Sequence, residues 1–450
     1  MAHTNVTVVF TDLEVRENEQ KMAEESCLST SLEHREYPFA EQSRQSSVTA
    51  VLNYCKSKIL NPYLRVLSLV GLRPLISYQL ESCFCFQFVN SVYTIQLIVL
   101  LILGYLLQYM ACFRRDRGFC FKLVNNPYLI QIEDVKQIYE QICHAPLLFS
   151  FIIPSVLHLI GYIHAVLVIR HSDDDQLPVL MERVFLSSNS QSNQRKLVRT
   201  LWTFVTLTGI WMSLSLITVV CMMANGTINF KWLENMPEGV TVGLKILLVV
   251  CILWHDVVQA TIISNYCLQT QLLTTYLQCL QEKLLQQLVQ PLEWIRHIET
   301  FKKMLRFVNN ELAPSVCVFT FINLACAISG ILWFFDYDNV DKETVPIGGI
   351  STLNVILWLL LALAPFMQAS RLSNECDILR NAGQEVRTRP FVHQDTPRHD
   401  LDSILLYTAS LKLRAKLFSV PITGRYLCLF FMLVGIVILV LGQCHYFTSN

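Results

Sequence analysis

Seven long apolar runs constrain this chain of 450 residues more than any other feature of its sequence. Each run has about the 20 residues that a helix needs to cross the roughly 30 Å hydrocarbon core of a bilayer. Only 16% of the residues are charged, against roughly 25% in a soluble globular protein. The sequence therefore predicts an all-α polytopic membrane protein with seven transmembrane helices. The predicted spans are residues 88–112, 146–169, 201–223, 240–266, 314–335, 347–369 and 426–442.

Composition argues against several classes of function. Lys and Arg total 35, as do Asp and Glu, and no basic patch suggests a nucleic-acid partner. Many of the 16 cysteines, such as Cys251 and Cys317, lie inside apolar runs, where they are expected to act as small hydrophobic side chains. No cysteine pair recurs at zinc spacing, so no metal site is predicted. No nucleophile–base set, P-loop or dinucleotide fingerprint occurs, so we expect neither an enzyme nor a bound cofactor.

The region before the first span divides into two parts. Residues 1–50 are polar and lack periodicity, which predicts a disordered cytoplasmic tail. Residues 51–81 carry an amphipathic pattern, broken at Gly71 and Pro74, which predicts a helix lying on the lipid of the inner membrane face.

Lysine and arginine residues predict the orientation of the spans. With the N-terminus in the cytoplasm, the inner loops hold 19 of these residues and the outer segments hold seven. The outer loop 113–145 argues against this arrangement, because Arg114, Arg115 and Arg117 follow span 1 directly. A glycosylation sequon, Asn225-Gly226-Thr227, falls in a predicted outer loop. We therefore expect a plasma-membrane protein with a cytoplasmic N-terminus and an extracellular C-terminus.

The segment between spans 4 and 5 has a helical pattern of its own. Apolar residues recur there at alternating steps of four and three, which is the seam of packed helices. The members of this seam are Leu273, Leu277, Leu280, Leu284, Trp294, Ile298, Phe301, Leu305, Val308 and Leu312. Spans 4 and 5 are therefore predicted to continue below the membrane, and residues 267–312 and 401–420 to form a cytoplasmic helical domain. Two interpretations stay open: a hairpin that packs on itself, and a domain that meets other copies of the chain.

The last span carries the candidate pore residues. Ile436, Val440 and Gln443 fall on one stripe of the helix, and Leu429 and Met432 extend it. Apolar rings can gate a pore by dewetting, and a polar ring at its mouth rehydrates the ion. The alternative is that Gln443 simply meets interfacial water at the helix end.

A ligand pocket would need aromatic walls and a few polar groups. The candidates in the predicted spans are His158, Tyr162, Trp211, Trp254, Phe321 and Trp333, with Trp358 in span 6. Each aromatic residue has an alternative role facing lipid or the membrane interface. Asp256 is an acid deep in an apolar run, which makes it a functional candidate, unless span 4 already nears the inner interface there.

The layout and several short motifs resemble a known family. The last span of the gustatory branch of the insect gustatory and odorant receptor superfamily ends in TYhhhhhQF, where h is apolar. Here Gln443 and the five-residue spacer match, while Ile436, Val437 and Cys444 replace the Thr, Tyr and Phe. The stretch 415–422 resembles the family's join between the cytoplasmic and membrane halves of its last helix, and Gly71-Leu72-Arg73-Pro74 resembles its motif before span 1. The chain thus resembles a divergent gustatory receptor or gustatory receptor-like protein.

This resemblance implies a chemosensory receptor that acts as a ligand-gated cation channel. In that family four subunits assemble as homo- or heterotetramers through the cytoplasmic helices. The last span lines the pore, and a small-molecule ligand binds among spans 2 to 6. The changed residues of the last span keep a non-conducting receptor-like protein open as an alternative. A small-molecule transporter is another, although no repeat is evident, and a G-protein-coupled receptor would require the reverse orientation.

Overall fold

The structure is a computed structural model that describes most of the chain after residue 49. It covers residues 50, 52–75, 84–111, 113–114, 118–119, 148–171, 176–188, 191–225, 230, 237–286, 288–336, 345–388 and 397–449. Apart from Ala50, the predicted tail 1–50 lies outside the described residues. The rest is almost entirely helical, so the prediction of an all-α membrane protein is confirmed.

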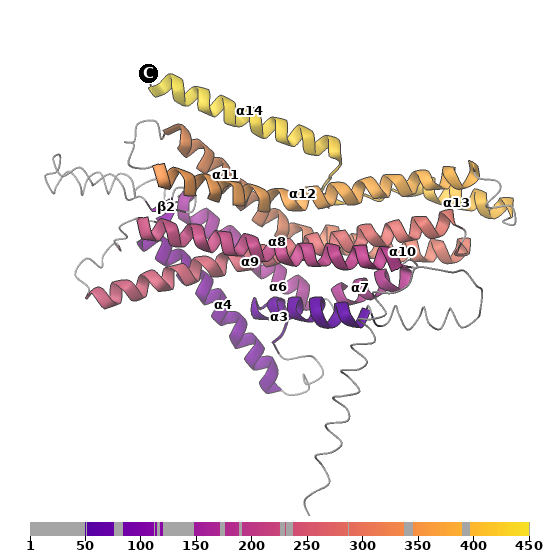
Figure 1. The fold of residues 1–450 in the computed structure, drawn as a ribbon, viewed down its shortest axis with the longest axis horizontal. Helices are drawn as coiled ribbons and strands as arrows, with labels where there is room; N and C mark the ends of the chain where they lie inside the picture. Colours follow the sequence, from indigo (N-terminus) through magenta and orange to yellow (C-terminus); the bar gives the residue numbers. More distant parts are fainter. Residues whose placement is uncertain are drawn as a thin grey trace, which may run out of the picture. The chain divides into compact units, whose positions relative to one another are not determined.

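Figure 1 shows the order of the elements along the chain. The helices before the long central ones are η1 (Lys56–Leu60), α3 (Asn61–Leu69), α4 (Phe84–Met110), η3 (Leu148–Ile152), α6 (Ile153–His171), α7 (Gln176–Ser187) and α8 (Gln191–Asn225). They are followed by α9 (Glu238–Leu285), α10 (Pro291–Phe307), η4 (Val308–Leu312), α11 (Ala313–Asp336), α12 (Val345–Thr388), α13 (Arg398–Ser410) and α14 (Gly424–Ser449). Two small antiparallel hairpins pair β1 (Phe113–Arg114) with β2 (Gly118–Phe119) and β3 (Lys416–Leu417) with β4 (Val420–Pro421).

Six of the described helices are long and apolar enough to cross a membrane. They are Phe88–Met110, Ile153–His171, Gln194–Met223, Glu238–Leu285, Pro291–Ile331 and Gly349–Val386. The predicted seventh span falls on α14, whose apolar stretch Gly424–Ile436 is shorter than the six. Six spans are therefore supported by length and composition in the described residues, and the seventh stays a prediction.

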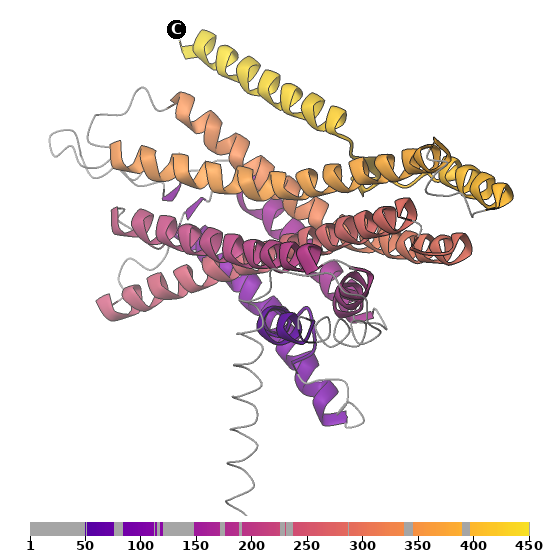
Figure 2. The ribbon, with the colours of Figure 1, turned by 45° about the vertical axis from the view of Figure 1, so that its right-hand side comes forward.

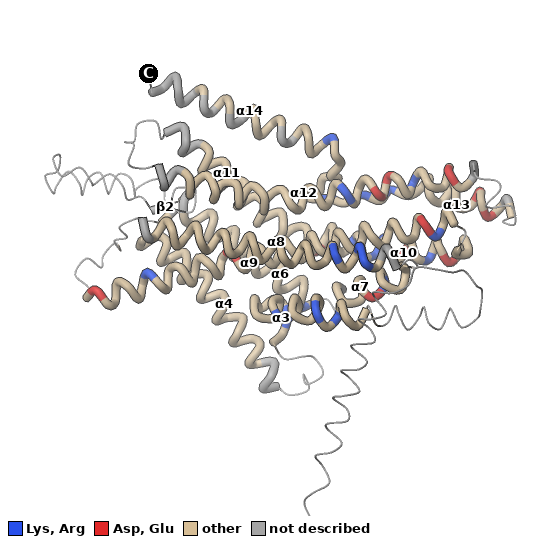
Figure 3. The backbone as a smooth tube through the Cα atoms, viewed as in Figure 1, with Lys and Arg blue, Asp and Glu red and all other residues tan. Residues whose placement is uncertain are grey.

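Charged residues are segregated along α12 and along the α10–α11 pair (Figure 3). In α12 no charged residue occurs before Arg371, whereas several follow it. The α10 helix is rich in charge, but α11, which continues it through η4, carries none between Ala313 and Phe335. The apolar half of each helix suits hydrocarbon and the charged half suits water, so these helices extend well beyond one face of the membrane.

The α9 helix lies at the centre of the fold. It contacts α4, α7, α8, α10, α11 and α12, and most of its side chains from Cys251 to Leu284 are buried. Its apolar residues are spread around the whole helix instead of forming one stripe, which is typical of a helix surrounded by protein. The polar residues in its middle are therefore held in the interior.

The seam residues pack within the chain. All ten are buried, and the indole Nε1 of Trp294 in α10 donates to the backbone oxygen of Leu280 in α9 at 3.0 Å. Figures 1 and 2 both show α10 running back along the end of α9. The structure thus has the self-packing hairpin, and assembly with other copies remains a prediction.

The amphipathic stretch breaks where the sequence predicts. The α3 helix ends at Leu69, and the following turn places Gly71 at a φ of +80°. Residues 76–81 lie outside the described residues. Backbone bonds from Leu72 to Leu67 and from Gly71 to Ser68 close the helix end in a Schellman motif, which favours glycine at this position. A Cβ on Gly71 would also lie 2.6 Å from Leu97 Cδ1, so the break predicted at Gly71 is confirmed.

The segment predicted as helix over residues 401–420 also needs correction. The α13 helix ends at Ser410, and the chain then runs extended into β3 and β4. Leu411, Leu413, Ala415 and Leu417 are buried, while the basic residues between them are exposed. This alternation has a period of two, which is typical of a strand with one buried face, and the helical prediction overlooked it.

Candidate functional site

A cluster of aromatic and histidine side chains lies between α4, α6, α9 and α11. At its centre is His255 of α9, which is fully buried. Its Nε2 donates to the backbone oxygen of Leu101 at 3.0 Å, because a carbonyl can only accept. The side-chain amide of Gln108 then donates to Nδ1 at 3.1 Å, and the Tyr105 ring packs against the imidazole at a centroid distance of 4.3 Å. The histidine is thus held in one tautomer and orientation.

The predicted ligand residue His158 joins this cluster from α6. Its ring centroid lies 5.1 Å from that of His255, 5.0 Å from Phe319 and 5.7 Å from Tyr105. The close approach of α4 depends on Gly104, where a Cβ would lie 2.5 Å from His255 Cε1. We call His158, His255, Tyr105, Gln108 and Phe319 the histidine cluster.

Asp256, about 100° around α9 from His255, anchors a second polar group. It is 1% exposed, and its two carboxylate oxygens accept from the Ser215 hydroxyl of α8 and, at 2.9 Å, from the Gln259 amide. The Asn323 amide of α11 donates to Gln259 Oε1 at 3.2 Å. We call Asp256, Ser215, Gln259 and Asn323 the carboxylate network. It joins three helices, so Asp256 is enclosed by protein, and its depth in the membrane stays a prediction.

Other predicted ligand residues lie in several different places. Tyr162 is buried and donates to the Val70 backbone oxygen at 2.9 Å, which fixes the turn at Gly71. Trp211 donates to the Leu357 backbone oxygen at 2.9 Å and so joins α8 to α12. Trp254 is half-buried against the main core, and Phe321 is 53% exposed on the surface. Trp333 lies in α11, but its side chain is outside the described part.

The structure brings together only part of the predicted ligand set. His158 contacts the histidine cluster, whereas Trp358 packs separately with Ala327 and Val355. His158 and Asp256 were predicted from the sequence, whereas Tyr105, Gln108, Ser215, Gln259 and Asn323 were not. A usable signal existed, because polar residues inside apolar runs are costly in a membrane and therefore tend to be functional or paired. In the described residues no group of three or more His, Cys, Asp or Glu side chains could hold a metal.

The candidate pore helix α14 leaves most of its surface uncovered in the single chain. It contacts α11 and α12, and Figures 1 and 2 both show it diverging from them toward its end. The half-buried positions Leu427 and Val434 are seven apart and share one face. Ile436, Val440 and Gln443 are all exposed and fall on the opposite face, at 100° per residue. The predicted stripe thus points away from the chain's own helices.

The linker into α14 is clamped to the rest of the protein. The Asn309 amide of η4 donates to the Arg414 backbone oxygen at 3.0 Å and accepts from the Lys416 backbone N–H at 2.9 Å. The Ser373 hydroxyl of α12 accepts from the Ala415 N–H at 3.1 Å. The side chain of Asn309 therefore makes the two backbone hydrogen bonds that a neighbouring strand would make. We expect a displacement of η4 or α12 to move the linker that precedes α14.

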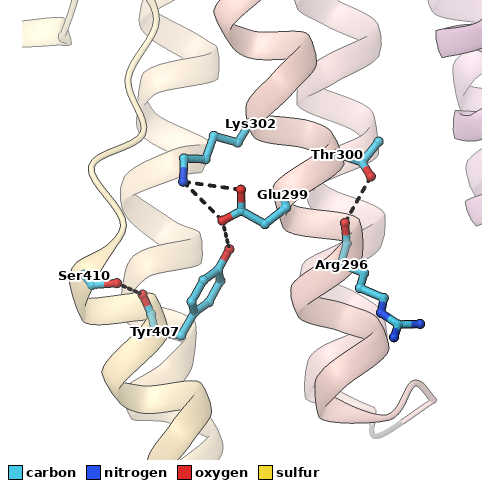
Figure 4. Close-up of polar contacts among 6 residues, drawn as sticks. All are labelled: Arg296, Glu299, Thr300, Lys302, Tyr407 and Ser410. Carbon is cyan, nitrogen blue, oxygen red and sulfur yellow. Dashed lines mark hydrogen bonds and ion pairs between the residues drawn. The ribbon is translucent and has the colours of Figure 1, made fainter.

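A polar contact joins α13 to α10 outside the apolar region (Figure 4). The Tyr407 hydroxyl donates to Glu299 Oε1 at 2.9 Å, and Lys302 Nζ lies 3.1 Å from the same oxygen. The Tyr407 ring also packs edge-on against Trp294, with centroids 6.3 Å apart. Together these contacts hold α13, and thus the linker, on the α9–α10 hairpin.

Replacing Tyr407 by phenylalanine is expected to loosen α13 while its ring packing remains. Loss of the hydrogen bond to a half-exposed carboxylate costs about 0.5–1.5 kcal/mol. Amide hydrogen exchange in α13 should therefore rise several-fold, up to about tenfold. The exposed Tyr54 provides the matched Tyr→Phe control, which should leave α13 unchanged. Equal exchange in the Tyr407 variant and the unsubstituted protein would contradict this role.

Comparisons with known proteins support the fold. No protein-family model matches the chain, and no curated protein matches it. The insect olfactory receptor OR5 from Machilis hrabei superposes with a TM-score of 0.57 at 11% identity, over 85% of this chain and 97% of that one. The structure of OR5 in complex with eugenol gives a TM-score of 0.55 at 10% identity, over 88% of this chain and 100% of that one. The resemblance to the insect gustatory and odorant receptor superfamily is thus confirmed at the level of the fold: this polytopic membrane protein has the fold of an insect olfactory receptor.

Proposed function

We propose that the protein is a chemosensory receptor that acts as a ligand-gated cation channel. The observation that carries this proposal is the exposed face of α14. Val440 is 54% exposed and Ile436 is 56% exposed in the single chain, on the side turned away from α11 and α12. A stripe that ends in a polar glutamine suits a pore better than lipid, because its apolar part can gate and its polar end can meet the hydrated ion.

Assembly as a homo- or heterotetramer would place four such stripes around a shared axis. Symmetric rings of this kind are the ordinary way in which identical chains enclose a central path. The charged ends of α9, α10 and α12, with α13, would provide the contacts between subunits outside the membrane. We place the N-terminus in the cytoplasm and the C-terminus outside the cell, at the plasma membrane, from the distribution of Lys and Arg in the loops.

The ligand is proposed to be a small molecule that binds near the histidine cluster. This region offers aromatic walls and a few polar groups, as small-molecule sites do. His158, Tyr162, Trp211, Trp254, Phe321 and Trp333 remain the candidate ligand residues, of which His158 lies in the cluster. The OR5 receptor of similar fold has been solved with eugenol, so eugenol belongs among the compounds tested first.

A non-conducting receptor-like membrane protein is the alternative, favoured by one observation. Ile436, Val437 and Cys444 stand where the gustatory signature has Thr, Tyr and Phe. If those residues serve conduction in the family, their replacement removes polar and aromatic groups from the last span.

Whole-cell current in cells that express the chain distinguishes these functions. We expect eugenol, a sugar, a bitter compound or a lipid to evoke a cation current. Val440→Trp should reduce that current at least about tenfold, because four indole rings would obstruct the path, and Gln443→Ala should change its ion selectivity. Leu360→Trp introduces the same side chain at an exposed position of α12 and should leave the current unchanged. If neither α14 substitution changes the size or the ion selectivity of the current, the proposed pore is contradicted.

A further inference from the structure

A cavity of about 200 Å³ lies between the amphipathic helix α3 and helices α7, α8 and α9. On α8 its lining runs from Leu201 to Met212, directly after Arg199, the last charged residue of that helix. On α9 it runs from Thr261 to Leu272, before the next charge at Glu282. The cavity thus lies beside the boundary between the basic and the apolar parts of α8. None of the candidate ligand residues lines it.

The wall of this cavity favours an apolar occupant. Three of its four hydroxyl groups are already engaged: Tyr63 and Ser264 share a hydrogen bond of 3.1 Å, and Thr208 donates to the Phe204 backbone oxygen at 2.9 Å. The fourth hydroxyl group belongs to Thr261. The floor is buried, whereas Val66 of α3 and Val205 of α8 are partly exposed, so the cavity is open between these two helices.

The size of the cavity limits what can enter it. Sites for drug-sized molecules are about 300–1,000 Å³, whereas an apolar cavity of about 150 Å³ can hold benzene. A narrow hydrocarbon chain therefore fits better than a bulky ligand.

Six exposed cations lie on the helices that line the cavity. Three lie on η1 and α3, at Lys56, Lys58 and Arg65, and three lie in the first turns of α8, at Arg195, Lys196 and Arg199. Among the described residues none of the six has an acidic partner. A basic cluster on an amphipathic helix at a membrane boundary favours anionic lipid.

We propose that this cavity binds one acyl chain of an anionic phospholipid, whose headgroup is held by the cations of η1, α3 and α8. The lipid would fill the space between α3 and the helix bundle and fasten the amphipathic helix to it. This site is separate from the proposed pore and from the histidine cluster, and it does not depend on conduction.

The test is retention of lipid by the purified full-length protein. The protein is equilibrated with equal amounts of dioleoyl phosphatidylglycerol and dioleoyl phosphatidylcholine, and its bound lipid is counted by native mass spectrometry. The unsubstituted protein should retain phosphatidylglycerol in preference to phosphatidylcholine. Gly209→Phe should reduce that retention at least about tenfold, since Gly209 lines the cavity and a Cβ there meets no atom within 4 Å. Gly243→Phe on α9 also has open space, lies outside the cavity and should retain the lipid.

The contact with the lipid headgroup is tested by removing the positive charges of three cations. The combined variant Lys56→Gln, Lys58→Gln and Arg65→Gln should lower the preference for phosphatidylglycerol at least about tenfold. The matched control, Arg296→Gln, Lys303→Gln and Arg306→Gln on α10, should keep it. The proposal is overturned if the unsubstituted protein retains neither lipid or both equally, if Gly209→Phe binds as the unsubstituted protein does, or if both charge variants lose the preference alike.

Discussion

Replacing Asp256 by alanine is expected to destabilise the protein, whereas replacing it by asparagine is not. Alanine leaves the Ser215 hydroxyl and the Gln259 amide buried without their acceptor. Each buried polar group that loses its partner costs about 1–3 kcal/mol. Thermal unfolding of the purified protein should therefore show a clearly lower midpoint for Asp256→Ala.

The Asp256→Asn variant removes the negative charge of Asp256 but can keep its hydrogen bonds. Its oxygen can accept from Gln259, and its amide can donate to the Ser215 oxygen, because a hydroxyl group both donates and accepts. The stability of Asp256→Asn should then stay within about 1 kcal/mol of the unsubstituted protein. If asparagine destabilises as strongly as alanine, the network does not hold the helices by hydrogen bonding alone, and the charge itself is required.

A valine at position 104 is expected to force α4 away from α9. Its Cβ would lie 2.5 Å from His255 Cε1 and 3.0 Å from Cys251 Cβ. Neither neighbour can easily yield, since the imidazole is bonded to Leu101 and Gln108 and the Cys251 Cβ is fixed by the helix backbone. Overpacking of this kind costs about 1–3 kcal/mol, and it should also abolish any ligand response that needs the histidine cluster.

The control for this prediction is Gly349→Val on α12, where a Cβ meets no atom within 4 Å. It should leave both the unfolding midpoint and the response unchanged. If Gly104→Val behaves like the control, α4 does not pack on His255 as closely as the structure has it.

Periodic patterns predicted much of the fold. The seam leucines and Trp294 are buried as their spacing requires, because helix packing depends on the period of the apolar residues. The same method failed after Ser410, where the apolar residues alternate with Lys412, Arg414 and Lys416. Basic residues that follow a helical segment suggest one charged face of a longer helix, although their period of two indicates an extended chain.

The site could be predicted only in part. Asp256 and His158 stand out in apolar runs, but His158 and His255 belong to different spans, and the sequence gives no measure of the distance between them. Their contact depends on how α6 and α9 pack. The close approach of α4 to the same cluster depends on the small residue Gly104. The face of α14 that carries Val440 followed from helical geometry, whereas its exposure could be seen only in the structure.

The most direct test of the central claim is chemical access to the α14 stripe during current flow. Gln443→Cys is prepared with Cys444→Ser, so that the neighbouring thiol does not react, and a positively charged thiol reagent is applied in the presence of an activating compound. The proposed pore predicts that the reagent removes most of the cation current of Gln443→Cys and leaves Leu360→Cys in the same background unaffected. Persistence of the full current after the introduced thiol at position 443 is shown to be modified would contradict a pore lined by α14.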